Sequence, residues 1–208
     1  MRPAQAVDYF LGLSPQIGID PERFGPLHER EAFTLAHMTD ETLLSRIQKI
    51  IAERIETGQA IGPTPAVIGD ILNQAGLTPR NPQYGEMVFR TNMMDSYTVG
   101  TMREMQDPDV ADTFPVWKYL GIRDGRQGKD HEPHFNHYYP NGVAFADVRG
   151  PRVFNCRCAP VPVSKFEWKR LQQRGAHVTF SEKFAAPGPP PRPGLVWNDQ
   201  THRWHRPE

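Results

Sequence analysis

The polar segment from residue 122 to residue 137 holds the chain's densest group of side chains that could do chemistry. It contains His131 and His134, and the only cysteines, Cys156 and Cys158, follow it. Residues two apart on an extended strand point to the same face, so both thiolates could bind one zinc ion. Imidazoles from the two histidines would complete a tetrahedral set of ligands. These residue types predict a structural zinc site.

A second interpretation of the cysteines needs no metal. A zinc knuckle usually has two residues between its cysteines, whereas only Arg157 separates Cys156 from Cys158. A disulfide between them would close a strained ring and restrain almost no chain. Free cysteine is among the most buried residue types, so both thiols could simply pack in the core. The sequence leaves both interpretations open.

The same segment also allows a catalytic interpretation. His131 or His134, near Asp124 and Arg126, could do general acid–base chemistry on a phosphodiester, as in a metal-free ribonuclease. However, an Asp-x-Arg pair in a loop is more often a salt bridge or a turn anchor. The chain has no P-loop, no dinucleotide fingerprint and no nucleophile elbow. We therefore expect no catalytic residues and no small-molecule substrate.

The overall charge excludes some classes of partner. Lys plus Arg and Asp plus Glu are equal at 24 each, so no global field draws the 208-residue chain to nucleic acid or an anionic membrane. Contact with DNA would need a basic patch. The candidates for that patch are Arg152, Arg157, Lys165, Lys169, Arg170 and Arg174. No apolar run is long enough to cross a bilayer and no secretion signal is present, so we expect a cytoplasmic protein with no membrane partner.

Helices dominate the first half of the chain. Isoleucines and leucines recur every three or four residues between Asp40 and Gly58, which predicts an amphipathic helix. Thr64 as the N-cap, followed by Pro65, predicts a second helix that ends at Gly76. Short apolar clusters broken by proline and glycine make long helices unexpected before residue 40.

A third helix, predicted to be the longest, follows Asn81-Pro82 and ends at Asp107-Pro108. Its apolar stripe runs from Tyr84 to Met102. Arg90 and Asn92 lie beside this stripe, and by physical reasoning alone we expect them on the helix surface.

Beyond Pro115 the chain becomes mixed. Residues 116–122 and 143–148 read as strands of a small sheet, and Ser164 is the expected N-cap of a short helix over residues 165–171. A proline-rich spacer over residues 185–194 then leads to a tail that carries Trp197 and Trp204. That tail is too short to fold alone, so it either covers the protein's own core or binds a partner.

Several motifs occur in order along most of the chain. They are Ala32–Ala36, Phe89-Arg90-Thr91-Asn92 with Tyr97 and Gly100, Asp124-x-Arg126 with His131, Asn155-Cys156-Arg157-Cys158, and the tail with Trp197 and Trp204. In these residues the chain resembles the Mu protein F-like family of phage head morphogenesis (minor head) proteins. The Asp-Arg-His and Cys-Arg-Cys residues are similar to the family's most diagnostic block.

The resemblance implies a protein present in few copies in the virion head, associated with the portal vertex and needed for capsid assembly or genome delivery. Its expected partners are the portal protein, the major capsid protein or both, and a basic face formed by the cations named above would add phage DNA as a partner. Many relatives place a Cys-x-x-Cys where this chain has Arg126 to His131, which weakens the case for four zinc ligands. Some relatives carry a C-terminal toxin, whereas only a short tail follows the linker here.

These observations predict an α+β protein. We expect a helical region over residues 1–78, a small mixed domain over 79–182, a proline-rich linker over 183–194 and an aromatic tail over 195–208. The main rival to a structural head protein is a phage-borne nuclease or ADP-ribosyltransferase-like effector. An effector needs a cleft lined by His131 and Arg126, whereas an assembly protein can hold them in a buried polar network.

Overall fold

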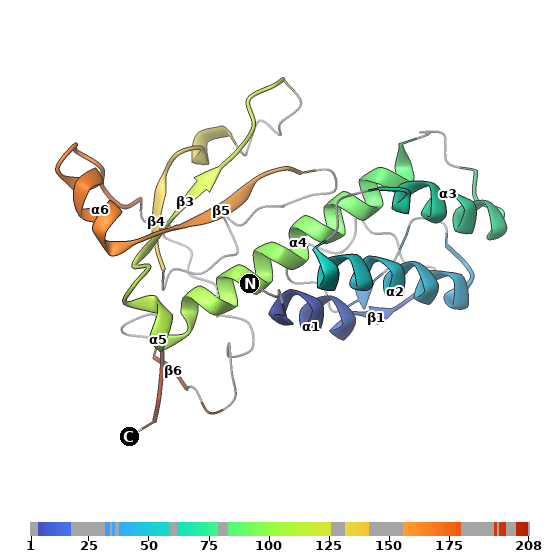
Figure 1. Cartoon of the computed structure of the whole chain (residues 1–208), viewed down its shortest axis with the longest axis horizontal. Helices are drawn as coiled ribbons and strands as arrows, with labels where there is room; N and C mark the ends of the chain where they lie inside the picture. Colours follow the sequence, from blue (N-terminus) through green and yellow to red (C-terminus); the bar gives the residue numbers. More distant parts are fainter. Residues whose placement is uncertain are drawn as a thin grey trace. The chain divides into compact units, whose positions relative to one another are not determined.

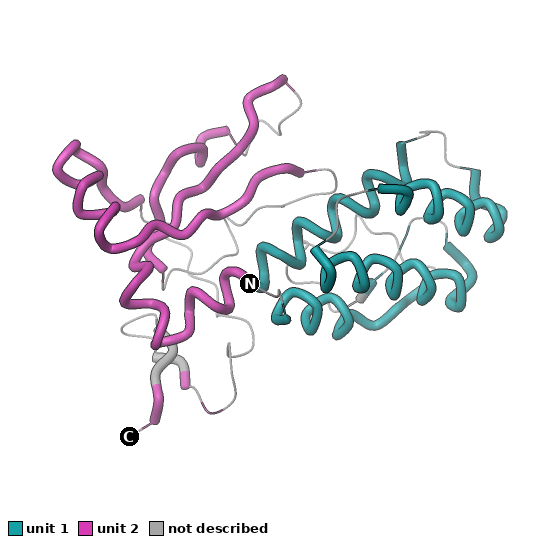
Figure 2. Tube along the Cα trace, viewed as in Figure 1, with its two compact units in different colours: residues 1–100, 151–155 teal, residues 101–150, 156–208 magenta. Residues whose placement is uncertain are grey.

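A computed structural model describes the chain in segments. The described residues are 4–17, 32–33, 35, 38–58, 62–78, 83–125, 132–141, 156–179, 194, 196–198 and 203–207. They form several helices followed by a small three-stranded antiparallel sheet (Figure 1), which confirms the α+β class. Two compact units divide the described residues between Gly100 and Thr101 (Figure 2). This division by contacts does not test the predicted boundaries at residues 78 and 182, which stay predictions.

The first unit is built from helices. A pair of two-residue parallel strands, β1 and β2, joins them. The elements are α1 (Ala4–Gly12), β1 (Ser14–Pro15), β2 (Ala32–Phe33), α2 (Glu41–Thr57), α3 (Thr64–Gln74) and α4 (Tyr84–Gln106), of which α4 continues into the second unit.

Helix α2 begins and ends where its sequence predicts. The Asp40 side chain accepts a 3.0 Å hydrogen bond from the backbone nitrogen of Leu43, which satisfies one of the unpaired donors of the first turn. Gly58 ends the helix in the left-handed conformation, with φ at 63°, a geometry that costs glycine little.

The predicted N-cap of α3 is wrong. Thr64 is the first helical residue, and Pro63 is the cap, without a side-chain hydrogen bond. Proline holds φ near the helical value, and Pro63 at φ −78° and ψ −1° lets the helix begin one residue earlier than expected. Thr64 is consequently buried, at 1% exposure.

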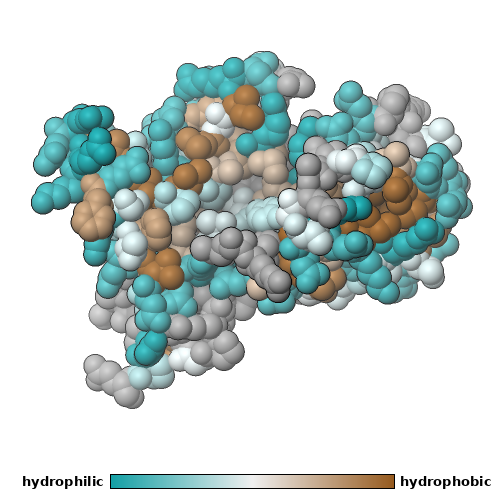
Figure 3. Space-filling view, viewed as in Figure 1, coloured by the Kyte–Doolittle hydropathy of each residue, from teal (hydrophilic) through white to brown (hydrophobic). Residues whose placement is uncertain are grey.

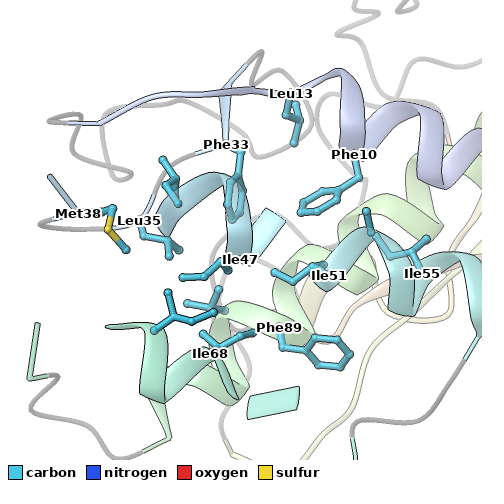
Figure 4. Close-up of a cluster of buried hydrophobic side chains, with 14 of the residues drawn as sticks. Phe10, Leu13, Phe33, Leu35, Met38, Ile47, Ile51, Ile55, Ile68 and Phe89 are labelled. Atoms are coloured by element: carbon cyan, nitrogen blue, oxygen red, sulfur yellow. The ribbon is translucent and has the colours of Figure 1, made fainter. Parts of the chain in front are cut away.

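One apolar cluster forms the core of the first unit. Figure 4 shows Phe10 of α1, Phe33 of β2, and Ile47, Ile51 and Ile55 of α2 turned toward a shared interior. Phe10 and Phe33 meet edge to face with ring centroids 5.4 Å apart. Such a core explains why the helical periodicity of α2 was a dependable signal, since one whole face of that helix is buried.

The second unit places a sheet and short helices after α4. Its sheet has the order β4-β3-β5, with both pairings antiparallel. The elements are α5 (Pro108–Ala111), β3 (Val116–Leu120), a 3-10 helix (Glu132–His134), β4 (Tyr138–Pro140), β5 (Ala159–Val163), α6 (Lys165–Gln172), β6 (Val196–Asn198) and β7 (Arg203–His205). Strand β3 and helix α6 with its Ser164 cap confirm the predictions, whereas the predicted strand at 143–148 and the spacer at 185–193 lie outside the described residues.

The aromatic tail forms a small antiparallel hairpin. Strands β6 and β7 pair so that Trp197 lies opposite Trp204 in the register. Strand β7 packs against α5, and Arg206 makes a 3.1 Å ion pair with Asp109 at the N-terminus of that helix. The described part of the tail is therefore folded back on the second unit.

Candidate functional site

A bidentate ion pair joins two parts of the predicted motif block. The guanidinium of Arg157 donates hydrogen bonds of 2.8 and 2.7 Å to the two carboxylate oxygens of Asp124. This two-point geometry is the strong form of an arginine–carboxylate contact. The hydrogen bond with Asp124 raises the pKa of Arg157 above its ordinary value. The pair ties the loop after β3 to the segment before β5.

The two cysteines flank Arg157, and their side chains are buried, unlike the partly exposed side chain of Arg157. Cys156 is 7% and Cys158 3% exposed, and neither is part of a disulfide. They pack in a second apolar cluster whose other members are Met102, Met105, Trp117, Tyr119, Phe135 and Tyr139. Alternation along an extended segment therefore buries the thiols and leaves Arg157 partly exposed, where it meets Asp124.

His134 reaches the same cluster from the 3-10 helix. Its Nδ1 and the hydroxyl of Tyr139 share a hydrogen bond of 2.9 Å, and its ring meets Tyr119 edge to face at 5.8 Å. Burial raises the pKa of Tyr139 above its ordinary value. The contact gives His134 a packing role in the described structure.

The donor set for zinc is incomplete within the described residues. No group of three or more His, Cys, Asp or Glu side chains there is arranged to hold a metal ion. Cys156, Cys158 and His134 are described, but His131 lies outside the described residues. Zinc at this site stays a prediction.

The catalytic interpretation has the same limit. Arg126 and His131 lie outside the described residues, so their positions test neither the effector nor the network interpretation. Asp124 is described, and both of its carboxylate oxygens accept hydrogen bonds from Arg157. This arrangement suits an anchor between two chain segments better than a general base, which needs an oxygen directed at a substrate proton.

The predicted surface position of Asn92 is wrong. Asn92 and Thr91 are both 0% exposed, and Asn92 donates a 2.7 Å hydrogen bond to the carbonyl oxygen of Val88 one turn earlier. Arg90 is half-buried and pairs with Glu86 at 2.9 Å. The Arg-Thr-Asn motif thus lies inside the helical unit, apart from the partly exposed Arg90.

Asn92 is buried because α4 is packed on several sides. Tyr9 of α1 donates to Asp95, and Tyr97 donates to the carbonyl oxygen of Ile55 at the end of α2. A Cβ on Gly85 would lie 2.6 Å from the carbonyl oxygen of Pro65 in α3, so the backbones of α3 and α4 are close there. Periodicity in the sequence predicted this helix but not its packing on several sides, because buried polar residues such as Asn92 resemble those of a solvated face.

Two structural residues of α4 were missed or left without a role by sequence reasoning. Asp95 is 0% exposed and holds α1 through Tyr9. Gly100 lies against Ala6, because a Cβ there would be 2.8 Å from the backbone nitrogen of Ala6. For Gly100 the available signal was its position inside a helix, where glycine costs about 0.5–1 kcal/mol relative to alanine.

The chain is similar to the "Putative capsid assembly protein F" of Escherichia phage Mu. The two are 24% identical over 202 residues, which cover 88% of this chain and 45% of the relative. The chain thus spans less than half the length of that relative. The resemblance seen in the sequence is confirmed as a distant similarity that runs through most of the chain.

Two further comparisons found nothing. No family model matches the chain, and no solved structure matches it. Among the described helices, none combines the length and the apolar composition that a membrane crossing requires.

Proposed function

We propose that this protein is a structural minor head protein of a tailed phage or prophage, which takes part in capsid assembly and genome delivery at the portal vertex. The observation that carries the proposal is the similarity to a capsid assembly protein over 88% of the chain. Because the similarity covers both compact units, the proposed role belongs to the whole folded chain and not to one motif.

The described positions of the motif residues support a structural role. Thr91, Asn92 and Gly100 lie inside the helical unit. Asp124 and Cys158 lie in or beside the second core, where they join segments that are distant in sequence. Contacts of this kind maintain a shape, and a defined shape is what an assembly component must present to its neighbours.

The proposed partners are the portal protein and the major capsid protein. The test is a pull-down of the tagged full-length chain from cells in which heads are assembling, with portal and capsid proteins identified by mass spectrometry. We expect portal protein to be recovered. A matched control is the Asp95→Ala variant, which removes the buried acceptor of Tyr9 and should reduce recovery by disturbing the fold.

An enzymatic activity of the purified chain would contradict this proposal. Cleavage of RNA or DNA, or modification of a host protein, should be absent from the purified protein. Activity that is lost in a still-folded His131→Ala variant would replace the assembly role with an effector role.

A further inference from the structure

Helix α6 is strongly basic. Lys165, Lys169 and Arg170 lie within it, and Arg174 follows in the turn after it. Its single acidic residue is Glu167, near the N-terminus, where it complements the helix dipole. The chain as a whole carries no formal net charge, so this concentration of cations is local.

The cations share one side of the helix. At roughly 100° per residue, Lys165, Lys169 and Arg170 fall on one face, with Phe166 between them. The opposite face carries Trp168, whose ring meets Tyr138 of the sheet at 5.2 Å. Hydrophilic side chains gather at the α6 end of the second unit (Figure 3).

This face is open to a partner. Lys165, Lys169, Arg170 and Arg174 are all exposed, and none makes an ion pair with another described residue. Phe166 is 72% exposed, the largest exposed fraction among the described large hydrophobic side chains. Its one described ring contact is with the ammonium group of Lys165, at 5.6 Å. A group of exposed cations with no acidic partner attracts the phosphate backbone of a nucleic acid.

The basic face is smaller than the sequence suggested. Arg157 was one of its candidates, but this residue is bound to Asp124, and Arg152 lies outside the described residues. The four cations of α6 and its following turn remain. Helix α6 rises about 11 Å from Lys165 to Gln172, and Arg174 lies in the turn beyond it, so the cations extend far enough to meet several phosphates of a duplex.

We propose that this face binds the phosphate backbone of double-stranded DNA without reading its sequence. Lys165, Lys169, Arg170 and Arg174 contact phosphates, and Phe166 packs against the sugars between them. No base-reading side chains are needed, since phosphate contacts position a protein but carry no sequence information. The choice of DNA as the polyanion rests on the proposed head function, in which the packaged genome is the neighbouring polymer.

The test is fluorescence anisotropy of the full chain with a labelled 30-base-pair duplex of arbitrary sequence, repeated at several salt concentrations. If all four cations meet phosphates, log K should fall with log salt with a slope of about −3.6, so affinity drops roughly 150-fold between 50 and 200 mM salt. The double variant Lys169→Gln with Arg170→Gln should reduce the magnitude of that slope by about 1.8.

A matched control removes the same charge from another exposed helix surface. Arg46 and Lys49 of α2 are both exposed, and their double glutamine variant should bind DNA like the unchanged protein. Equal losses in both double variants, or binding that is absent at low salt, would overturn the proposal. The readout needs only purified protein, so its failure is distinguishable from failure to recover portal protein from assembling heads.

Discussion

The hydroxyl of Tyr9 donates a 2.9 Å hydrogen bond to the carboxylate of Asp95, and both residues are buried. This contact joins α1 to the centre of α4 across 86 residues of sequence. A buried carboxylate needs such donors, because leaving one of its oxygens without a partner costs about 1–3 kcal/mol. Tyr9 thus fixes the first helix of the chain on its longest one.

Replacing Tyr9 with phenylalanine should therefore weaken the first unit. Tyr9→Phe keeps the ring but removes the donor, and we expect a loss of about 1–3 kcal/mol in the free energy of unfolding, measured with urea. Tyr138→Phe is the control, since the Tyr138 hydroxyl has no hydrogen-bond partner among the described residues, and its effect should be below about 0.5 kcal/mol. If both variants lost the same free energy of unfolding, the hydrogen bond between Tyr9 and Asp95 would not be what holds α1 on α4.

Gly100 should not tolerate a methyl group. In Gly100→Ala the new Cβ would lie 2.8 Å from the nitrogen and 3.0 Å from the Cβ of Ala6, so α1 must shift. We expect a net loss of about 1–3 kcal/mol even though alanine favours helices.

A second glycine in a helix interior provides the matched control. Gly69 lies within α3, and a Cβ there would have no atom within 4 Å. Gly69→Ala should accordingly raise stability by up to about 1 kcal/mol. Melting temperatures that move in the same direction for both variants would contradict the close approach of α1 and α4.

The Asp124–Arg157 pair should depend on its two-point geometry. Lysine in place of Arg157 keeps the charge but offers no planar fork, and we expect a loss of about 1 kcal/mol for Arg157→Lys. The side chains are 20% and 26% exposed, so salt should screen this pair only partly.

The exposed pair in the tail gives the comparison. Arg206 and Asp109 are 67% and 59% exposed, and Arg206→Lys should change stability by less than about 0.5 kcal/mol in thermal unfolding. A smaller effect at Arg157 than at Arg206 would mean that the Asp124 anchor does not hold the two segments together.

Cys158 should be sensitive to a polar replacement. Its side chain is 3% exposed among Trp117, Tyr119 and Tyr139, so Cys158→Ser places a hydroxyl in an apolar cluster and should lower stability by about 1–3 kcal/mol.

Elemental analysis of the unchanged protein, purified without chelator, decides between the two interpretations of the cysteines. About one zinc per chain, with a melting temperature lowered by chelator, supports the metal site. A zinc-free protein that is indifferent to chelator makes both thiols ordinary core residues.

Local signals in the sequence predicted local structure well. Asp40 and Gly58 bracket α2, and Ser164 caps α6 by accepting from the backbone nitrogen of Glu167, because caps act within one turn. The burial of Asn92 was not predictable in this way. It results from packing by helices that are distant in sequence, and no periodicity within α4 records those neighbours.

Strand β5 shows a second limit of sequence reasoning. Pro160 and Pro162 argue against a central strand of a sheet. Among the described strands β5 lies at the edge of the sheet, where proline is tolerated. Tyr119 is opposite Pro160, and its backbone N–H and C=O groups both form hydrogen bonds on the β4 side. Hydrogen bonds alternate along an antiparallel pair, so the backbone nitrogens of Pro160 and Pro162 face away from β3, toward the outer edge. They leave the pairing with β3 intact and remove donors that another strand could use.

The candidate site was only partly predictable for a related reason. The sequence singled out Asp124, Cys156 and Cys158 as parts of one block, but it did not indicate which residue Asp124 would bind. Arg157 is 33 residues away, and only the fold brings the two together. The thiols could be assigned to one face because alternation is a local property of extended chain.

The most direct test of the account is the protein content of gradient-purified heads. Quantitative mass spectrometry of heads assembled with the unchanged chain should find it in a small, fixed number of copies relative to portal protein. Heads assembled without the gene should form less often or deliver DNA poorly. Heads that lack the chain yet form in normal numbers and infect normally would contradict a structural role in the head.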